Sequence, residues 1–166
     1  MKVNDKFMDD ADNCLNNIID RLTHDSFFVE CDITTEYTAF EEDVKDFCDK
    51  YIDTYIKNNK YEEAFNSLVR LTDAIVDVED NMDMDDYYRP VELITYYFAK
   101  LLTLSRGAIK NRIHNWMYNY VEEYKDISLI ADEYFRVFLE GKMIYHADEY
   151  YTNYNDYNHV LSYYVD

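Results

Sequence analysis

The sequence predicts an all-α fold, with antiparallel helical hairpins packed as a small bundle or a short helical-repeat array of about six to seven helices. Three observations predict this class. The 166 residues include only two glycines and one proline, whereas all-β folds need many more turn residues. Apolar residues recur at helical spacing in several segments. The joints between these segments are short, as between antiparallel neighbours. We expect a single domain over residues 1–166.

Two apolar stripes predict the first two helices. The first stripe extends from Phe7 to Leu22, and the second extends from Phe40 to Tyr55. In both stripes an apolar residue returns after three or four positions, as on one face of an α-helix. The stretch from Ser26 to Thr34 between them fits either a short strand or a connector.

Helix-breaking residues place the next two helices. A third stripe, from Tyr61 to Ile75, starts just after the breaker Asn58-Asn59. Pro90 is expected in the first turn of a fourth helix, where its missing N–H costs no hydrogen bond. Gly107 is expected to end that helix, because glycine readily adopts the backbone conformation that follows a last turn.

The C-terminal part of the chain predicts a fifth and a sixth helix. The fifth covers the apolar stripe from Ile109 to Tyr124, and a weaker sixth runs from about Ser128 to Leu139 and stops at Gly141. Residues 142–166 then form a segment rich in tyrosine and acidic residues. It fits either a terminal helix docked on the bundle or an interface.

Parts of this pattern are similar to known helical families. The piece from Asn59 to Leu68 resembles the helix-opening segment of a tetratricopeptide repeat, although no second copy follows. A looser resemblance covers roughly Val44 to Leu139. This part is similar to the α-helical region of bacterial SWIM-type zinc-finger proteins in the order of its elements: a helix, an NNKYEEAF helix, the acidic loop DVEDNMDMDD, a helix and an NRIHNWMYNYVEEYKD helix. The zinc motif is absent from this chain. The resemblance therefore implies a scaffold and no activity.

The net charge restricts the kind of partner. The chain has 16 Lys and Arg against 35 Asp and Glu, a formal net charge of −19. Solubility alone requires a magnitude of only about 2–8. Such a chain is repelled by nucleic acid and by anionic membranes, and it is attracted to basic surfaces. We therefore expect no direct nucleic-acid or membrane binding.

One stretch departs from this acidic character. Lys100 to Tyr120 contains no acidic residue. Because the field of the whole molecule opposes nucleic-acid binding, we expect Arg106, Lys110 and Arg112 to face acidic residues of a neighbouring helix or of a second copy. A homodimer is therefore one expected assembly.

The cysteines and the hydropathy indicate the compartment. Cys14, Cys31 and Cys48 are odd in number and far apart, which is typical of reduced, buried thiols in a cytoplasmic protein. We expect no signal peptide and no membrane span, because no apolar run approaches about 18 residues.

No motif for catalysis or metal binding is complete. The acidic stretch from Asp77 to Tyr88 has Met82 and Tyr88 where an EF-hand calcium loop needs glycine and glutamate. The histidines are too dispersed for a zinc site, which needs at least three placed ligands. No serine lies in a glycine-flanked nucleophile turn. We therefore expect no metal, no cofactor, no catalytic residue and no enzymatic activity.

Three acidic segments are the candidate partner-binding residues. On the second helix, acidic residues spaced 4, 3 and 4 form one stripe opposite the apolar stripe, where their mutual repulsion is unfavourable. The other two are the acidic loop and the C-terminal segment, whose tyrosines suit stacking by arginine. The candidates are Glu42, Asp46, Asp49, Asp53; Asp77, Glu79, Asp80, Asp83, Asp85, Asp86; and Asp148, Glu149, Tyr150, Tyr151, Tyr154, Tyr157. The alternative interpretation is a set of solvated surfaces without a partner.

By charge and size the chain resembles the acidic anti-restriction and anti-CRISPR proteins of phages as a class. The expected function is that of a non-catalytic phage or mobile-element inhibitor. It would mimic nucleic acid and block the DNA- or RNA-binding groove of a host defence nuclease, such as a CRISPR or restriction nuclease. The alternative is a helical-repeat adaptor that binds another protein.

Overall fold

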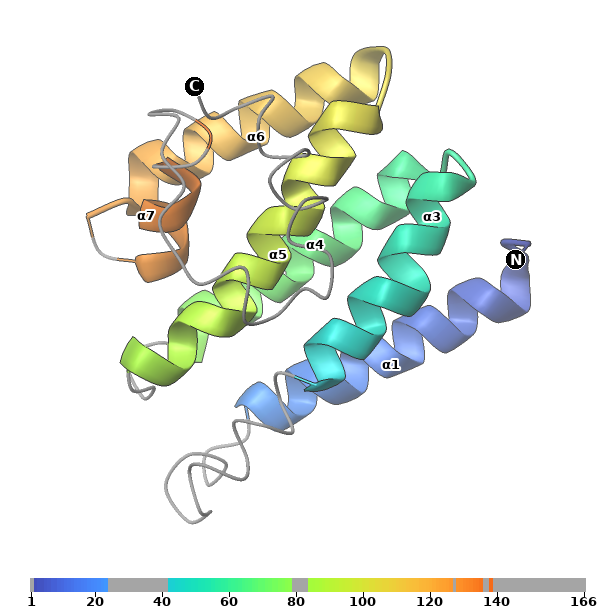
Figure 1. Ribbon diagram of the computed structural model, residues 1–166, viewed down its shortest axis with the longest axis horizontal. Helices are drawn as coiled ribbons and strands as arrows, with labels where there is room; N and C mark the ends of the chain where they lie inside the picture. Colours follow the sequence, from blue (N-terminus) through green and yellow to red (C-terminus); the bar gives the residue numbers. More distant parts are fainter. Residues whose placement is uncertain (1, 24–41, 79–83, 127, 136–137, 139–166) are drawn as a thin grey trace.

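The computed structural model describes residues 2–23, 42–78, 84–126, 128–135 and 138. All regular structure in these residues is helical, which confirms the all-α part of the prediction for the described residues (Figure 1). The elements are α1 (Asp5–Thr23), η1 (Cys48–Ile52), α3 (Asp53–Lys57), α4 (Tyr61–Val78), α5 (Met84–Leu104), α6 (Ala108–Tyr124) and α7 (Leu129–Tyr134). Residues 42–47 are also helical and continue into η1 and α3. We call this continuous stretch the 42–57 helix.

Helix α4 is the centre of the described fold. It contacts α1, η1, α3, α5, α6 and α7. Its buried residues cover about half of its circumference, because two neighbouring residues are buried in each successive turn and not only one. They are Ala64, Phe65, Ser67, Leu68, Leu71, Thr72, Ala74 and Ile75. The predicted third stripe, apart from the half-buried Tyr61, therefore lies at the centre of the core.

Helix α1 and the 42–57 helix pack side by side in opposite directions (Figure 1). The Phe7 ring, near the start of α1, lies 5.2 Å from the Tyr51 ring and 5.5 Å from the Tyr55 ring, between centroids. At the other end of α1, the Arg21 guanidinium donates to the Asp43 carboxylate. Each aromatic pair of this kind contributes about 0.5–1.5 kcal/mol beyond the area that it buries.

A wide turn in the 42–57 helix keeps its apolar side aligned with the core. Val44, Cys48, Ile52 and Ile56 are all buried and recur every four residues. In a regular α-helix, each step of four residues rotates by about 40° away from the starting direction. Element η1 is a π-helical turn, in which the Asp53 N–H donates to the Cys48 carbonyl five residues back. This wider turn offsets the drift.

Aromatic rings join α5, α6 and α7. The Trp116 ring stacks on Phe98, with centroids 5.4 Å apart, and on Tyr120, with centroids 5.0 Å apart. Tyr134 of α7 is fully buried beside Phe98, and its hydroxyl lies 2.8 Å from the Thr72 hydroxyl of α4. Large rings with one satisfied polar atom are well suited to such a core.

The acidic segment between α4 and α5 is shorter than expected. Helix α4 continues to Val78, and α5 begins at Met84, so that Pro90 lies inside α5 and not in its first turn. The expected start at Pro90 is therefore wrong. Asp85 and Asp86 fall in the first turn of α5, where negative charge is favourable because of the helix dipole. Burial of the helix from Leu93 onward stabilises α5 despite the hydrogen bond that proline removes.

The break at Asn58-Asn59 is confirmed. A break near Gly107 is confirmed as well, but α5 already ends at Leu104, and Gly107 is the N-cap of α6 and not the residue that ends α5. Asn59 has a φ of 59°, the left-handed conformation that asparagine tolerates. Gly107 has φ 77° and ψ −151°, a region that essentially only glycine occupies. The stretch from Ser26 to Thr34 lies outside the described residues. No helix in the described parts of the chain is both long enough and apolar enough to cross a membrane.

Candidate partner-binding surface

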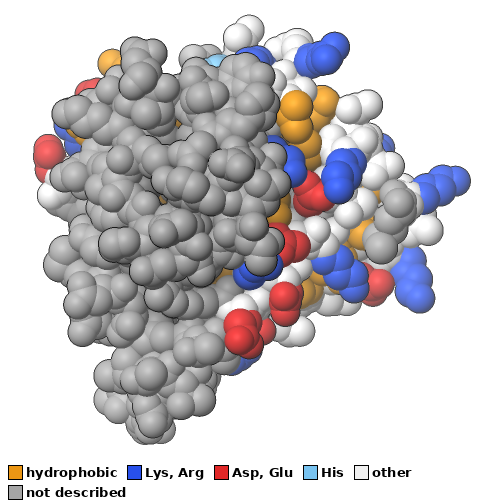
Figure 2. All heavy atoms as spheres, in the orientation of Figure 1, with side chains coloured by type: hydrophobic (Ala, Val, Ile, Leu, Met, Phe, Trp, Pro, Cys, Tyr) orange, Lys and Arg blue, Asp and Glu red, His pale blue; other side chains and the backbone are white. Residues whose placement is uncertain are grey.

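The structure divides the predicted acidic stripe on the 42–57 helix into two unlike pairs. Glu42 and Asp46 are exposed, and neither forms an ion pair with a described residue. Asp49 and Asp53 face α5 and are bound by its side chains. On the face shown in Figure 2, acidic and basic side chains are interspersed over the described part of the molecule. The stripe is thus not the uniform, uncompensated surface that the spacing predicts.

Asp49 connects the 42–57 helix to α5 through a tyrosine. The Tyr97 hydroxyl donates a hydrogen bond to Asp49 Oδ1, and Lys45 Nζ lies 2.6 Å from Asp49 Oδ2. Burial raises the pKa of the Tyr97 hydroxyl, and the hydrogen bond to Asp49 raises it further. Tyr97 therefore remains a proton donor at any physiological pH. The hydrogen bond to Asp49 likewise raises the pKa of Lys45.

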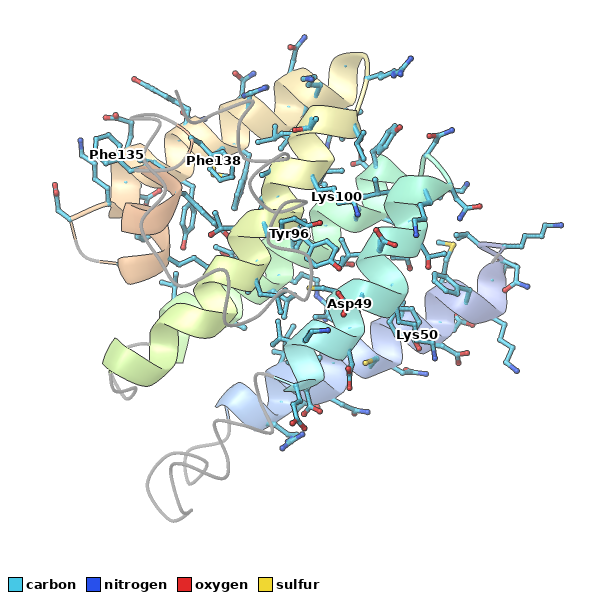
Figure 3. All side chains as sticks on the ribbon, viewed as in Figure 1. Asp49, Lys50, Tyr96, Lys100, Phe135 and Phe138 are labelled. Atoms are coloured by element: carbon cyan, nitrogen blue, oxygen red, sulfur yellow. The ribbon has the colours of Figure 1, made fainter. Side chains whose placement is uncertain are left out.

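Asp53 binds two lysines. Its Oδ1 lies 2.7 Å from Lys100 Nζ of α5, and its Oδ2 lies 2.7 Å from Lys57 Nζ, one turn along its own helix. The Asp53 side chain is only 15% exposed. Burial alone raises the pKa of this carboxyl, but the hydrogen bonds from Lys100 and Lys57 outweigh burial, so that the pKa lies below its usual value. Figure 3 shows Asp49 and Lys100 on facing sides of the gap between the two helices.

Part of this compensation has a signal in the sequence. Lys45 precedes Asp49 by four residues, and Lys57 follows Asp53 by four residues. Both spacings bring side chains together on one helix. Tyr97 and Lys100, in contrast, belong to another helix. Only the packing of α5 against η1 and α3 brings them to the stripe.

A second acidic stripe lies on α1, and the sequence reasoning missed it. Asp5, Asp9, Asp12 and Asp20 are exposed, and none forms an ion pair with a described residue. They lie opposite the buried side of α1, which consists of Phe7, Ala11, Leu15 and Ile18. Their spacing is helical, with Asn16 in the place between Asp12 and Asp20. The sequence does contain a signal for this stripe: acidic residues recur at spacings of three or four opposite the apolar stripe of the first predicted helix, as they do on the 42–57 helix.

The two open acidic groups lie on neighbouring helices. A hollow of about 310 Å³ between α1 and the 42–57 helix is lined by Cys14, Asn17, Ile18, Arg21, Asp43 and Asp46. Asp46 thus borders the junction between the two helices. We call Asp5, Asp9, Asp12, Asp20, Glu42 and Asp46 together the N-terminal acidic surface. A base also lies on it, because the Arg70 guanidinium of α4 donates to Asn16 Oδ1, between Asp12 and Asp20.

The structure leaves the other acidic candidates undecided. Asp77, Asp85 and Asp86 belong to helices α4 and α5, but the positions of their side chains are not described. The remaining candidates lie outside the described residues. They are Glu79, Asp80, Asp83, Asp148, Glu149, Tyr150, Tyr151, Tyr154 and Tyr157.

The basic section is paired at only some positions. Arg112 of α6 binds Glu62 of α4, with 2.9 Å between Nη1 and Oε2, as expected for a base that faces a neighbouring helix. Arg106 and Lys110 form no ion pair with any residue in the described ranges. Within those ranges, no group of three or more His, Cys, Asp or Glu side chains is placed to hold a metal ion.

Comparisons with known proteins give no relative. No protein-family model matches the sequence, and neither a similar curated protein nor a similar solved structure was found.

Proposed function

We propose that this chain is a non-catalytic inhibitor that mimics nucleic acid and blocks the DNA- or RNA-binding groove of a host defence nuclease. The observation that carries the proposal is the exposed stripe of Asp5, Asp9, Asp12 and Asp20, without ion pairs among the described residues, in a chain of net charge −19. Fifteen helical steps separate its ends, a distance of about 22 Å. This is roughly two thirds of one turn of a DNA duplex.

The mechanism is competitive. Carboxylates of the N-terminal acidic surface occupy phosphate positions against lysine and arginine in the groove of the nuclease. Tyrosines of the segment 142–166 occupy sites where bases stack. Such an inhibitor acts in the cytoplasm of the host, and a phage or mobile element is its expected source. We further propose that the complete chain is one domain of six to seven helices, arranged as antiparallel hairpins.

The test is displacement of DNA from a basic defence nuclease. In Asp9→Lys/Asp12→Lys the charge of the α1 stripe is reversed at two positions. The matched control is Glu122→Lys/Glu123→Lys, which changes the net charge equally at exposed positions of α6. We expect the first variant to weaken inhibition about tenfold or more, and the control to change it far less. Equal losses would show that only net charge matters, and unchanged inhibition in the α1 variant would contradict the proposed surface.

A helical-repeat adaptor is the second candidate. Two observations favour it. Asp49 and Asp53 are already bound within the fold, and charges of both signs are interspersed on the face in Figure 2. An adaptor would bind a partner without a nucleic-acid groove, and high salt would leave that complex intact. For a nucleic-acid mimic, the affinity would fall steeply as the salt concentration rises, because each contact between a lysine or arginine of the nuclease and a carboxylate of the inhibitor is electrostatic.

A further inference from the structure

A hollow of about 600 Å³ lies at the end of the molecule where the 42–57 helix turns into α4. It is lined by Ile56, Lys57, Asn59, Tyr61, Lys100, Leu104 and Arg106. Its volume falls in the range of about 300–1,000 Å³ that is typical of small-molecule sites. None of the residues of the N-terminal acidic surface lines the hollow.

The charge of this hollow is opposite to that of the chain. Among the described residues, three bases line it and no acidic residue does. Lys57 and Lys100 share one carboxylate, that of Asp53, and Arg106 forms no ion pair with any described residue. Among the described residues, these three positive charges are therefore paired with one negative charge, that of Asp53. In a chain of net charge −19, such an excess of positive charge at one place is unexpected for a surface without a ligand.

The hollow also offers apolar surface and a fixed polar group. Leu104 is 45% exposed, one of the large apolar side chains of the described residues that remain open to water. The Tyr61 hydroxyl donates to Asn59 Oδ1 at 2.8 Å, which fixes the ring at the edge of the hollow. An apolar wall beside a few converging polar groups is the usual composition of a ligand site.

We propose that this hollow, the Lys57/Lys100/Arg106 pocket, binds a small organic anion: a phosphate monoester or a carboxylate on an apolar body. The forked guanidinium of Arg106 suits two oxygens of either group. Lys57 and Lys100 supply further donors, and Leu104 with Tyr61 contacts the apolar body. This site is independent of the proposed inhibitor function.

Asp53 makes the proposal specific, because it competes with the ligand. The carboxylate of Asp53 already holds the two lysines, and an incoming anion must share them. Removal of the negative charge in Asp53→Asn should therefore strengthen anion binding. A generic attraction between an anion and scattered surface bases would not single out this residue against other exposed acids.

The experiment measures the binding of phenyl phosphate, inorganic phosphate and benzoate to the full chain by calorimetry at constant ionic strength. We expect phenyl phosphate or benzoate to bind more tightly than inorganic phosphate, because of the apolar wall. Tighter binding of phenyl phosphate would identify a phosphate monoester as the preferred ligand, and tighter binding of benzoate would identify a carboxylate. Arg106→Ala should weaken that binding about tenfold. Lys60→Ala is the matched control, since Lys60 is exposed beside the hollow without lining it.

Three outcomes would overturn the proposal. The first is no binding of any probe at millimolar concentration. The second is an equal loss in Arg106→Ala and Lys60→Ala, which would indicate net charge alone. The third is unchanged or weaker binding in a folded Asp53→Asn variant, which would show that the two lysines do not hold the anion. If Asp53→Asn fails to fold, the comparison between Arg106→Ala and Lys60→Ala decides, because both side chains are exposed.

Discussion

Lys100 of α5 binds Asp53 of the 42–57 helix across 2.7 Å, and both side chains are mostly shielded from solvent, with 20% and 15% of their area exposed. This ion pair attaches the helix with the predicted acidic stripe to α5, whose described residues from Leu93 to Ala99 are all buried. It also shows that an acidic residue in a chain of net charge −19 can serve stability and not a partner. Loss of one member leaves the other charge poorly solvated, which costs more than the net value of the pair.

The first prediction concerns Asp53 and pH. Because the folded-state pKa of this carboxyl is lowered, its contribution to stability is present above the unfolded pKa of about 4 and is lost as pH falls through the folded pKa. Asp53→Asn should reduce the free energy of unfolding at neutral pH by about 1.5–3 kcal/mol. Urea denaturation between pH 7 and pH 2 should show a smaller acid-induced loss in this variant than in the wild type. Asp46→Asn is the matched control at an exposed position, and its free energy of unfolding at neutral pH should stay within about 0.5 kcal/mol of the wild type.

The second prediction concerns the buried hydroxyl pair between α4 and α7. The Thr72 hydroxyl donates to the Leu68 carbonyl at 2.8 Å, and Tyr134 therefore donates to Thr72. Thr72→Val leaves the Tyr134 hydroxyl buried without that acceptor and should cost about 1–3 kcal/mol. Tyr134→Phe should cost less, because Thr72 retains Leu68.

A double-mutant cycle checks this pair. The double variant should be more stable than the sum of the two single losses indicates, by about 1 kcal/mol. Strictly additive losses in thermal or urea unfolding would mean that the two hydroxyls are not coupled.

The third prediction concerns the joint between α5 and α6. A Cβ built on Gly107 meets no atom within 4 Å, so that space does not restrict this position. The backbone conformation restricts the position to glycine, because essentially only glycine adopts φ 77° with ψ −151°. Gly107→Ala should therefore destabilise the protein by about 1–3 kcal/mol. Asn59→Gly, at a left-handed position that glycine adopts easily, should change stability far less. A wild-type melting temperature for Gly107→Ala would contradict the assigned backbone conformation.

The sequence was sufficient for the helices and their buried sides, for a local reason. Helical periodicity and breakers act within a few residues, so that the apolar stripe of Phe7, Ala11, Leu15 and Ile18 on α1 and the joint near Gly107 follow from neighbouring positions. The start of α5 was not predicted, because the helix begins at Met84, on the N-terminal side of Pro90. How far a helix continues past a proline depends on tertiary packing and not on the local sequence pattern. The π-helical turn was missed as well, although the four-residue repeat of Val44, Cys48 and Ile52 was visible.

The candidate surface was less predictable, because ion pairs between helices depend on packing. From the sequence, Asp49 and Asp53 are equivalent to Glu42 and Asp46. Only the approach of α5 brings Tyr97 and Lys100 to the first two and leaves the others open. Spacing on one helix identifies which acidic residues share a side. It does not identify which of them a neighbouring helix will neutralise.

The last prediction separates these two halves of the stripe. Glu42→Lys/Asp46→Lys reverses charge at exposed positions without ion pairs among the described residues, and stability should remain within about 0.5 kcal/mol of the wild type. Asp49→Lys/Asp53→Lys introduces the same change in net charge but places positive groups beside Tyr97 and Lys100. This variant should lose about 2–4 kcal/mol, because Tyr97 loses its acceptor and the new lysines face Lys45, Lys57 and Lys100 in place of carboxylates. Urea denaturation at neutral pH measures both. If the two variants unfold at the same urea concentration, the contacts between the 42–57 helix and α5 do not stabilise the fold, and the whole stripe again becomes a candidate for binding a partner.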